Sequence, residues 1–295
     1  MENMHVAFCC DNNYIMPASI MLESLMRNNR NRHIIAHTFT DDLNENSIET
    51  LRLLVEKYQG ELVTHQLPEE AIETMKNAPL AWEYLSTAAY YRLMLPYVLD
   101  EAVEKVLYLD CDVMVRKNLE QYYDCPIKDN YVAGVHDIEE EQHSERLNLP
   151  LYVNSGVLVM NIREIKQSFS LNEMLDEMNR LMKRDEVTCG DQDIINIIFH
   201  KKMLILQDAF NYQHCIHKKY VLKHKKEVQE AAVVHFITSD KPWFSTYVFP
   251  YTREYYVYLK KYFGIGKKLR YWLSKPAGLV KIIKKHNDYM SGKSE

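Results

Sequence analysis

The stretch VLYLDCDVMV, residues 106–115, places two aspartates, Asp110 and Asp112, in an otherwise apolar run that is rich in β-branched residues. A run of this kind is typical of a strand inside a sheet. Burying ionised carboxylates is costly unless they are paired with a positive charge or hold a cation. The stretch itself contains no positive charge, so the two aspartates call for a cation from elsewhere.

Strand and helix patterns alternate on both sides of this stretch, which predicts an α/β fold. Strands are predicted at 5–9, 34–40, 61–66, 105–109, 131–137, 153–162 and 231–236, and helices at 17–28, 47–60, 86–95, 170–184, 191–200 and 251–263. The strand over 105–109 ends directly before Asp110. In open α/β sheets ligands bind beyond the carboxyl ends of the strands, so a functional cation is expected there.

Two helix boundaries are predicted from local chemistry. Asp41 and Asp42 are the candidate N-caps of the helix over 47–60, because short acidic side chains accept hydrogen bonds from the first helical amides. The helix over 86–95 is expected to end at Pro96.

Size and composition predict one large α/β domain, because 295 residues with 47% hydrophobic content can bury a full core. The net charge of -5 argues against general nucleic-acid binding. The N-terminus lacks the pattern of a secretory signal, and no apolar run approaches the roughly 18 residues of a membrane span. A cytoplasmic protein is therefore expected, with any membrane contact peripheral. Reduced thiols are expected of its cysteines, which show no CxxC pairing: Cys9, Cys10, Cys111, Cys125, Cys189 and Cys215.

Two aspartates one residue apart can turn toward the same ion where a strand gives way to a turn. Their hard oxygen ligands suit Mg²⁺ or Mn²⁺. The DxD pattern also occurs in solvated acidic loops, which need no apolar neighbours. The VLYL that precedes Asp110 therefore favours a metal site.

Together with the N-terminal AFCCDNNY, the motif YLDCDVMV resembles glycosyltransferase family 8, and five blocks match in the family's order over most of residues 4–250. The chain is most similar to the bacterial lipopolysaccharide galactosyl- and glucosyltransferases and more distantly to the glycogenins. The resemblance implies a GT-A, Rossmann-like α/β fold with a mixed, mostly parallel sheet flanked by helices. It also implies a retaining enzyme with a catalytic domain over 1–263, which moves galactose or glucose from a UDP-sugar to a glycan or lipid-linked saccharide.

The resemblance further implies that Asp110, Asp112 and His235 of VVHFITSDKPW bind a divalent metal. A histidine ligand favours Mn²⁺ over Mg²⁺. Lys241 is then a cation for the donor diphosphate. The plainer interpretations are a polar residue that ends a strand for His235 and an ordinary surface lysine for Lys241.

At the N-terminus, the resemblance implies that Asp11 and Asn13 bind the base and ribose of uridine and that Tyr14 stacks on the uracil ring. Taken alone, DNNY is a turn-and-cap signal before a helix. Thr238 replaces a glycine of the family's H-x-x-G-x-x-K-P-W pattern. This departure implies a shifted backbone amide near the donor diphosphate. The residues that the resemblance places at the donor are Cys9, Cys10, Asp11, Asn13, Tyr14, Arg92, Asp110, Cys111, Asp112, Asn154, Thr238 and Lys241.

On the sugar side, the resemblance implies that Asn154 of VNSGVLV and Asp137 of VHDI face the acceptor, and that Asp191 and Gln192 of CGDQDIIN are catalytic. An amide is a poor nucleophile compared with a carboxylate, so Gln192 favours front-face attack over a covalent intermediate. The plainer interpretation of the Asn154 block is a strand bulge that contains a glycine. The plainer interpretation of Asp193 is an acidic residue at a helix N-terminus, where the macrodipole favours it.

The C-terminal segment 264–295 forms a separate basic tail in this prediction. Residues 260–295 contain ten lysines and arginines against two acids. Apolar residues recur on one helical face, which suits peripheral contact with an anionic membrane surface on the cytoplasmic side. The alternative is an apolar face that packs on the main domain. The apolar residues are Leu269, Trp272, Leu273, Leu279, Ile282 and Ile283.

Two other classes of function remain open at this point. A phosphatase of the haloacid-dehalogenase type also carries its nucleophile in a DxD at a strand end, but it expects Thr or Val where this chain has Met114. A catalytically silent sugar-nucleotide-binding module could retain the nucleotide contacts without turnover.

Overall fold

The computed structural model describes residues 2–76, 78, 87–213, 230–237, 241–243, 251 and 254–260. The chain forms two compact units. The first comprises Met1–Gln213 and Lys225–His235, and the second comprises His214–His224 and Phe236–Glu295. All the strands and helices named below lie in the first unit. In the described part of the second unit, residues 254–260 are helical, and Tyr255 packs edge-on against Phe236.

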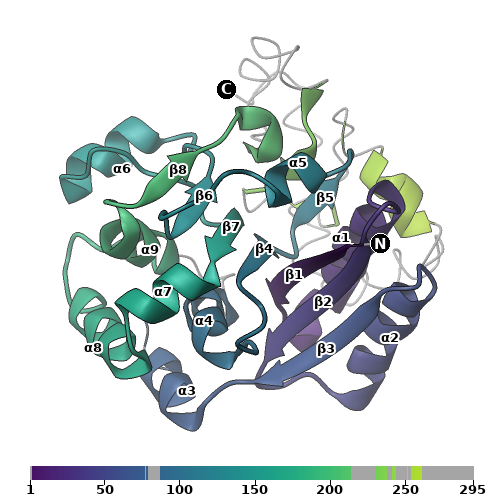
Figure 1. Ribbon diagram of the computed structural model, residues 1–295, viewed down its shortest axis with the longest axis horizontal. Helices are drawn as coiled ribbons and strands as arrows, with labels where there is room; N and C mark the ends of the chain where they lie inside the picture. Colours follow the sequence, from purple (N-terminus) through teal and green to yellow (C-terminus); the bar gives the residue numbers. More distant parts are fainter. Residues whose placement is uncertain are drawn as a thin grey trace, which may run out of the picture. The chain divides into compact units, whose positions relative to one another are not determined.

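A seven-stranded sheet forms the centre of the first unit, with strand order β3-β2-β1-β4-β7-β6-β8 (Figure 1). The pairs β3–β2, β2–β1, β1–β4 and β6–β8 are parallel, whereas β4–β7 and β7–β6 are antiparallel. The predicted α/β class with a mixed, mostly parallel sheet is therefore confirmed. The strands are β1 (Asn3–Cys9), β2 (His33–Thr40), β3 (Glu61–Gln66), β4 (Lys105–Leu109), β6 (Val132–Gly134), β7 (Val157–Asn161) and β8 (Met203–Ile205).

A second sheet of three strands follows the DxD motif directly. It contains β5 (Val113–Val115), β10 (Val233–His235) and β9 (Tyr212–Gln213) in the order β5-β10-β9. Strand β10 runs antiparallel to β5, and His235 pairs with Val113. This register brings the end of β10 next to Asp112.

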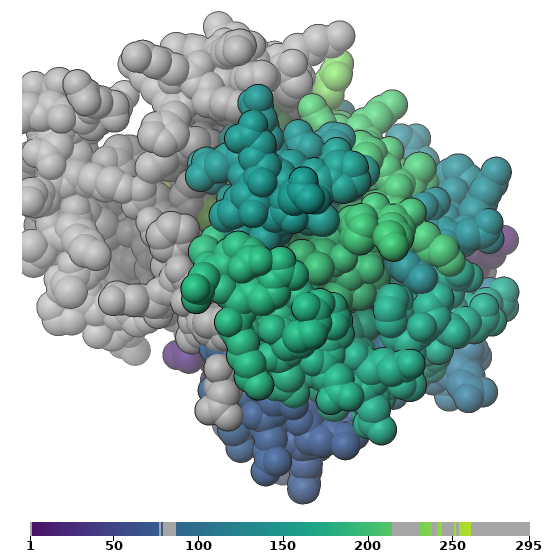
Figure 2. All heavy atoms as spheres, turned by 90° about the vertical axis from the view of Figure 1, so that its left-hand side faces the viewer, coloured from purple at the N-terminus to yellow at the C-terminus, as the bar shows by residue number. Residues whose placement is uncertain are grey.

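Helices cover both faces of the central sheet. The α-helices are α1 (Ile15–Asn28), α2 (Glu45–Glu56), α3 (Glu69–Lys76), α4 (Leu95–Val98), α5 (Glu120–Tyr123), α6 (Glu140–Leu147), α7 (Ile162–Ser168), α8 (Leu171–Leu181) and α9 (Asp191–Phe199). The 3₁₀ helices are η1 (Asn12–Tyr14), η2 (Thr87–Met94) and η3 (Asp208–Phe210). Figure 2 shows the face of the unit on which α6 and α8 lie.

Two hydrophobic cores lie on opposite faces of β1, because successive side chains of a strand point to opposite sides. Val6 and Phe8 belong to the core that includes residues of α1 and α2. Ala7 and Cys9 belong to the core that includes residues of η2, α7, α8 and α9. Each fully buried Val or Phe contributes roughly 1.5–3 kcal/mol, so the burial of β1 on both faces holds its carboxyl end firmly in place.

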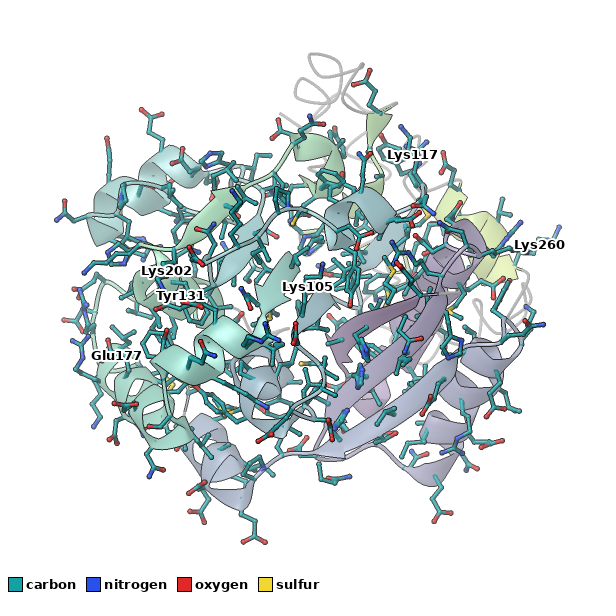
Figure 3. The ribbon with its side chains drawn as sticks, viewed as in Figure 1. Lys105, Lys117, Tyr131, Glu177, Lys202 and Lys260 are labelled. Carbon is teal, nitrogen blue, oxygen red and sulfur yellow. The ribbon has the colours of Figure 1, made fainter. Side chains whose placement is uncertain are left out.

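At the β8 edge of the sheet, polar contacts link the residues that directly precede β6 and β8. The backbone amide of Tyr131 donates to the carbonyl of Lys202 over 2.8 Å. The Lys202 Nζ atom lies 4.8 Å from the centre of the Tyr131 ring (Figure 3) and 2.6 Å from Glu164 Oε1.

Several predicted boundaries were wrong, among them those of the helix over 47–60, which spans Glu45–Glu56, and of the strand over 131–137, which spans Val132–Gly134. The cap of α2 is Asn44 rather than Asp41 or Asp42, because its Oδ1 reaches the amide of Ser47 at 2.9 Å. The predicted strand over 153–162 begins only at Val157, since a turn over 154–156 precedes it.

The segment predicted as one α-helix ending at Pro96 is instead the 3₁₀ helix η2, and α4 continues through Pro96. Pro96 lies in the first turn of α4, where the missing N–H leaves no helical hydrogen bond unmade.

Two further expectations can be compared with the described residues. Among them, no helix combines the length and apolarity that crossing a membrane requires. Five cysteines, Cys9, Cys10, Cys111, Cys125 and Cys189, are free thiols. The predicted basic tail and Cys215 lie outside the described residues.

Candidate functional site

Three residues from two strand ends converge on one point. One ligand atom from each of Asp110, Asp112 and His235 lies within 4.8 Å of the other two. His235 Nε2 is 3.2 Å from Asp112 Oδ1 and 3.9 Å from Asp110 Oδ2. Asp110 follows β4, and its backbone amide donates to the carbonyl of Gly156 over 2.8 Å. The predicted metal ligands are thus brought together, although the chain separates His235 widely from the two aspartates.

The backbone of Gly156 lies directly against two of these groups, His235 and Asp110. A Cβ atom built on Gly156 lies 2.2 Å from His235 Cε1 and 2.6 Å from Asp110 Oδ2. Real Cβ contacts essentially never come this close, so any side chain at this position displaces the candidate ligands. The absence of a side chain at Gly156 therefore lets His235 and Asp110 lie this close to its backbone.

Arg92 lies between two of the acidic residues. Its guanidinium contacts Asp110 Oδ1 at 2.9 Å and Asp191 Oδ2 at 3.1 Å, and it donates to the carbonyl of Ser155 at 2.7 Å. Arg92 is buried, so it does not serve merely to cover an exposed helix face. Tyr108 donates to the same Asp110 oxygen at 2.8 Å. Asp110 Oδ2 therefore faces the convergence point.

The charges of this cluster fit a divalent cation. Burial raises the pKa of Asp191 to about 6, and the nearby guanidinium of Arg92 opposes this shift. Asp110, Asp112 and Asp191 thus place three carboxyl groups beside the single guanidinium of Arg92. Buried charges need compensation, and a divalent cation bound by carboxylate oxygens and an imidazole supplies it.

A second group of predicted residues forms one hydrogen-bonded set. Asn154 Nδ2 donates to Asp137 Oδ2 at 3.0 Å and to Gln192 Oε1 at 3.1 Å. Gln192 Nε2 donates to the same Asp137 oxygen at 3.2 Å. The two predicted acceptor residues and the predicted catalytic amide are therefore in direct contact.

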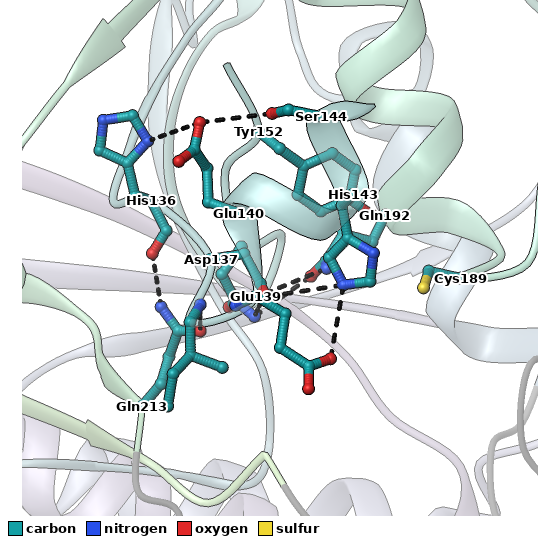
Figure 4. Close-up of polar contacts among 12 residues, drawn as sticks. His136, Asp137, Glu139, Glu140, His143, Ser144, Tyr152, Cys189, Gln192 and Gln213 are labelled. Carbon is teal, nitrogen blue, oxygen red and sulfur yellow. Dashed lines mark hydrogen bonds and ion pairs between the residues drawn. The ribbon is translucent and has the colours of Figure 1, made fainter. Parts of the chain in front are cut away.

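Asp137 also lies beside helix α6. Its Oδ1 atom is 3.7 Å from His143 Nε2, which is 3.8 Å from Glu139 Oε2 (Figure 4). The other ring nitrogen of His143 lies 3.1 Å from Arg146 Nη2. Because arginine can only donate, it bonds to an unprotonated Nδ1 and leaves the N–H of a neutral ring on the side of Asp137.

Asp193 does more than complement a helix dipole. It is fully buried and accepts from the amides of Thr188 and Cys189, both at 2.8 Å, from Arg146, and from the hydroxyl of Tyr152 at 2.6 Å. Burial by itself raises the pKa of Asp193, but the hydrogen bonds from Arg146 and Tyr152 lower it below its ordinary value. Asp193 thus ties α9 to α6 and supports the neighbouring Gln192.

The predicted uridine residues lie at the carboxyl end of β1. Asp11 Oδ1 accepts from the amides of Asn13 at 2.8 Å and Tyr14 at 3.1 Å, which makes it the cap of η1. Asn13 is exposed. Burial raises the pKa of the Tyr14 hydroxyl, and the nearby charge of Asp112 adds to the shift. Tyr14 is therefore close to the DxD motif, and the role of these residues in binding uridine stays a prediction.

Two thiols lie at the carboxyl ends of the neighbouring strands β1 and β4. The Cys111 thiol donates to the carbonyl of Cys9 at 3.1 Å, and the Cys10 thiol donates to the carbonyl of Asp11 at 3.3 Å.

In the second unit, Lys241 is buried, and its Nζ donates to the carbonyl of Phe236 at 2.5 Å. Lys241 is therefore not an ordinary surface lysine. Thr238 lies outside the described residues.

Sequence reasoning gave no site role to several residues that the structure places here. Ser155 and Gly156 directly follow Asn154, so the VNSGV motif itself carried a signal for both. Tyr108 lies inside the quoted VLYLD stretch. Asn211 contacts His235 Nδ1 at 3.2 Å and Asn154 Oδ1 at 2.8 Å, and no motif marked it.

Comparisons with known proteins agree with this geometry. The model described as "Glycosyl transferase family 8" matches residues 5–247. General stress protein A of Bacillus subtilis (strain 168) is 26% identical over 88% of this chain and 93% of its own length. A lipopolysaccharide 1,2-glucosyltransferase of Escherichia coli is 26% identical over 82% of this chain and 74% of its own length.

Among solved structures, the galactosyltransferase LgtC in complex with donor and acceptor sugar analogs matches with a TM-score of 0.73 and 21% identity. The match covers 88% of this chain and 96% of that one. At this level of identity the likeness shows a common fold.

Proposed function

The chain belongs to glycosyltransferase family 8, and from this premise we propose that it moves a hexose from a UDP-sugar to a saccharide acceptor with retention of configuration. The convergence of ligand atoms from Asp110, Asp112 and His235 within 4.8 Å is the observation that carries the proposal. The name of the E. coli relative, a lipopolysaccharide 1,2-glucosyltransferase, supports glucose as one candidate sugar and a lipid-linked glycan as one candidate acceptor. Galactose is the other candidate sugar.

The ligand set supports a divalent cation. Two carboxylates and one imidazole suit Mn²⁺ better than Mg²⁺, which prefers oxygen ligands. When bound, the cation acts as a Lewis acid that stabilises the negative charge of the departing diphosphate. We assign Asp110, Asp112 and His235 the task of holding it.

The remaining residues position the sugar and the acceptor. Asn154 and Gln192 both donate to Asp137 Oδ2, which orients that carboxylate toward the acceptor in this proposal. Arg92 pairs with Asp191, and this contact keeps a negative charge in place where the sugar carbon gains positive character. Gln192 is an amide and a poor nucleophile. We therefore favour front-face attack, in which the acceptor hydroxyl replaces the diphosphate on the same face and passes its proton to the diphosphate.

The donor nucleotide is assigned to the carboxyl end of β1. Tyr14 offers an aromatic face for uracil, and Asp11 and Asn13 lie in the same turn. Lys241 is assigned to the diphosphate. The catalytic domain is proposed to extend over 1–263, and the basic segment 264–295 is proposed to contact an anionic membrane.

The first test measures UDP release from a panel of UDP-hexoses, with and without Mn²⁺. Asp112→Asn is expected to lower Mn²⁺-dependent release by about 10²-fold or more, because a Lewis acid contributes several kcal/mol to the transition state. The exposed Asp129→Asn is the matched control and is expected to behave as the wild type. Circular dichroism of the variants checks that the fold is intact.

The alternatives give different results in the same assay. Wild-type release by Asp112→Asn contradicts the metal assignment. Binding of UDP-sugars without metal-dependent release supports a silent binding module. Phosphate release from simple phosphomonoesters supports the phosphatase.

A further inference from the structure

The second ring nitrogen of His235 has a partner outside the candidate metal site. His235 Nδ1 lies 3.2 Å from Asn211 Oδ1, and both residues are buried. We propose that Asn211 is a positioning residue that holds His235 in the tautomer with the proton on Nδ1 and a free lone pair on Nε2. The inference rests on the proposed metal site, since Nε2 is the nitrogen that faces Asp110 and Asp112.

The orientation of the Asn211 amide follows from a backbone group whose role is unambiguous. The amide N–H of Gly156 can only donate, and it lies 3.1 Å from Asn154 Oδ1, which is therefore an acceptor. The Asn211 atom that lies 2.8 Å from this oxygen must then be the donor Nδ2. The carbonyl oxygen of Asn211 is left to face His235, and an oxygen accepts only from a protonated Nδ1.

A second backbone amide independently supports the same orientation of the Asn154 side chain, through Gln192 Oε1, which accepts from Asn154 Nδ2. The amide N–H of Ser155 donates to Gln192 Oε1 at 3.0 Å, so Gln192 Nε2 must face Asp137. Asn154 Nδ2 also faces the Asp137 carboxylate, which accepts when ionised. All three side-chain amides are thus oriented by two backbone N–H groups and one carboxylate, without a conflicting contact among these bonds.

The consequence lies on the other side of the imidazole. With the proton on Nδ1, the lone pair of Nε2 faces Asp112 Oδ1 at 3.2 Å. Two acceptors at this distance repel each other unless a proton or a metal cation is shared between them. Histidines that bind metals commonly donate their other N–H to such a partner, and loss of the partner costs about 10–100-fold in metal affinity.

The test uses metal-free full-length protein and two readouts. Long-range ¹⁵N–¹H NMR, at a pH well above the ordinary histidine pKa of about 6.5, reports the tautomer of His235. Loss of the signals in His235→Gln assigns them. Titration with Mn²⁺, followed by the EPR signal of the free ion, gives the dissociation constant.

Three variants separate positioning from general stability. Asn211→Leu has a similar shape but no acceptor, and it is expected to lose the Nδ1–H tautomer and to bind Mn²⁺ about 10–100-fold more weakly. Asn211→Asp loses the donor to Asn154 but keeps an acceptor for His235, so it is expected to retain that tautomer and to bind Mn²⁺ within a few-fold of the wild type. Asn29→Leu removes another buried amide, which bonds Leu25 and Leu119, and is expected to affect stability alone.

A wild-type protein with the proton on Nε2 overturns the inference without any variant, so it stays testable even where Asn211→Leu does not fold. Unchanged Mn²⁺ affinity or an unchanged tautomer in a folded Asn211→Leu also overturns it. Failure of the wild type to bind Mn²⁺ sinks the proposed metal site instead, while the NMR arm still decides the role of Asn211.

Discussion

Gly156 and Asn211 act on the same imidazole in different ways. The missing side chain of Gly156 leaves room beside His235 and Asp110, and Asn211 contacts the opposite ring nitrogen of His235. Neither residue is a candidate metal ligand. The geometry of the three candidate ligands thus depends on residues whose own chemistry is unremarkable.

Gly156→Ala is expected to weaken Mn²⁺ binding by about tenfold or more, because the added Cβ displaces His235 and Asp110. UDP release is expected to fall with it. Gly134→Ala is the matched control, since its Cβ lies 2.8 Å from Leu158 Cδ2 in the core and not beside a ligand. This control is expected to lose about 1–3 kcal/mol of stability through overpacking and to keep its Mn²⁺ affinity. If Gly156→Ala binds Mn²⁺ as tightly as the wild type, the added Cβ does not displace the candidate ligands and this prediction is wrong.

Strands β1, β2 and β3 each contribute one histidine to a row across the sheet. His5 Nδ1 lies 2.9 Å from His37 Nε2, and His37 Nδ1 lies 2.9 Å from His65 Nε2. Burial lowers the pKa of all three, that of His37 to about 3, while Glu61 opposes the shift at His5. Phe39 stacks on the ring of His65. The row is therefore neutral in the folded protein at neutral pH.

Acid is expected to destabilise the protein through this row. The unfolded chain binds a proton at His37 below about pH 6.5, whereas the folded protein binds it only near pH 3. Stability therefore falls as the pH is lowered from about 6.5 toward 3, by about 2 kcal/mol at pH 5 for His37 alone. Urea unfolding at neutral pH and near pH 5 measures the loss.

His37→Leu removes the central group and is expected to be less stable at neutral pH but less sensitive to acid. His33→Leu, on the same strand and outside the row, serves as the control. An acid sensitivity of His37→Leu equal to that of the wild type disproves a role for the row.

At the scale of the whole molecule, the first unit joins two sheets around one set of polar residues. The turn after β4 supplies the DxD motif, the turn before β7 supplies Asn154, and the start of α9 supplies Gln192. Strand β10 completes the set with His235. The proposed tail over 264–295 is a separate, basic feature of the chain.

Deletion of residues 265–295 is expected to lower binding to vesicles that contain anionic lipid and to leave UDP release from a soluble donor nearly unchanged. Each Lys or Arg near an anionic surface contributes about 1 kcal/mol, so loss of several of them is measurable by vesicle sedimentation. Full-length protein with Lys281, Lys284 and Lys285 changed to Gln separates charge from chain length. Equal binding by the truncated and the full-length protein defeats the membrane proposal.

Agreement between predicted and observed bounds differs from element to element. Strands β3 and β4 have the predicted bounds, because burial imposes a continuous apolar or alternating pattern on them. The cap of α2 was misplaced because Asp41, Asp42 and Asn44 offer similar acceptors, and only the path of the chain decides which one reaches a helical amide. Pro96 was misread because a proline that stops one helix is equally suited to the first turn of the next.

Local patterns in the sequence were enough to predict the α/β class and the position of Asp110 and Asp112 at a strand end, because periodicity and burial act on neighbouring residues. The order of the sequence motifs also indicated glycosyltransferase family 8, which the family model confirmed. Three arrangements were not predictable from local sequence: the contact of Asn211 with His235, the place of Gly156 beside His235 and Asp110, and the position of Arg92 between Asp110 and Asp191. The reason is physical: the register between β10 and β5 and the packing of distant turns depend on how two sheets and their helices fit together, and local sequence carries no record of that fit.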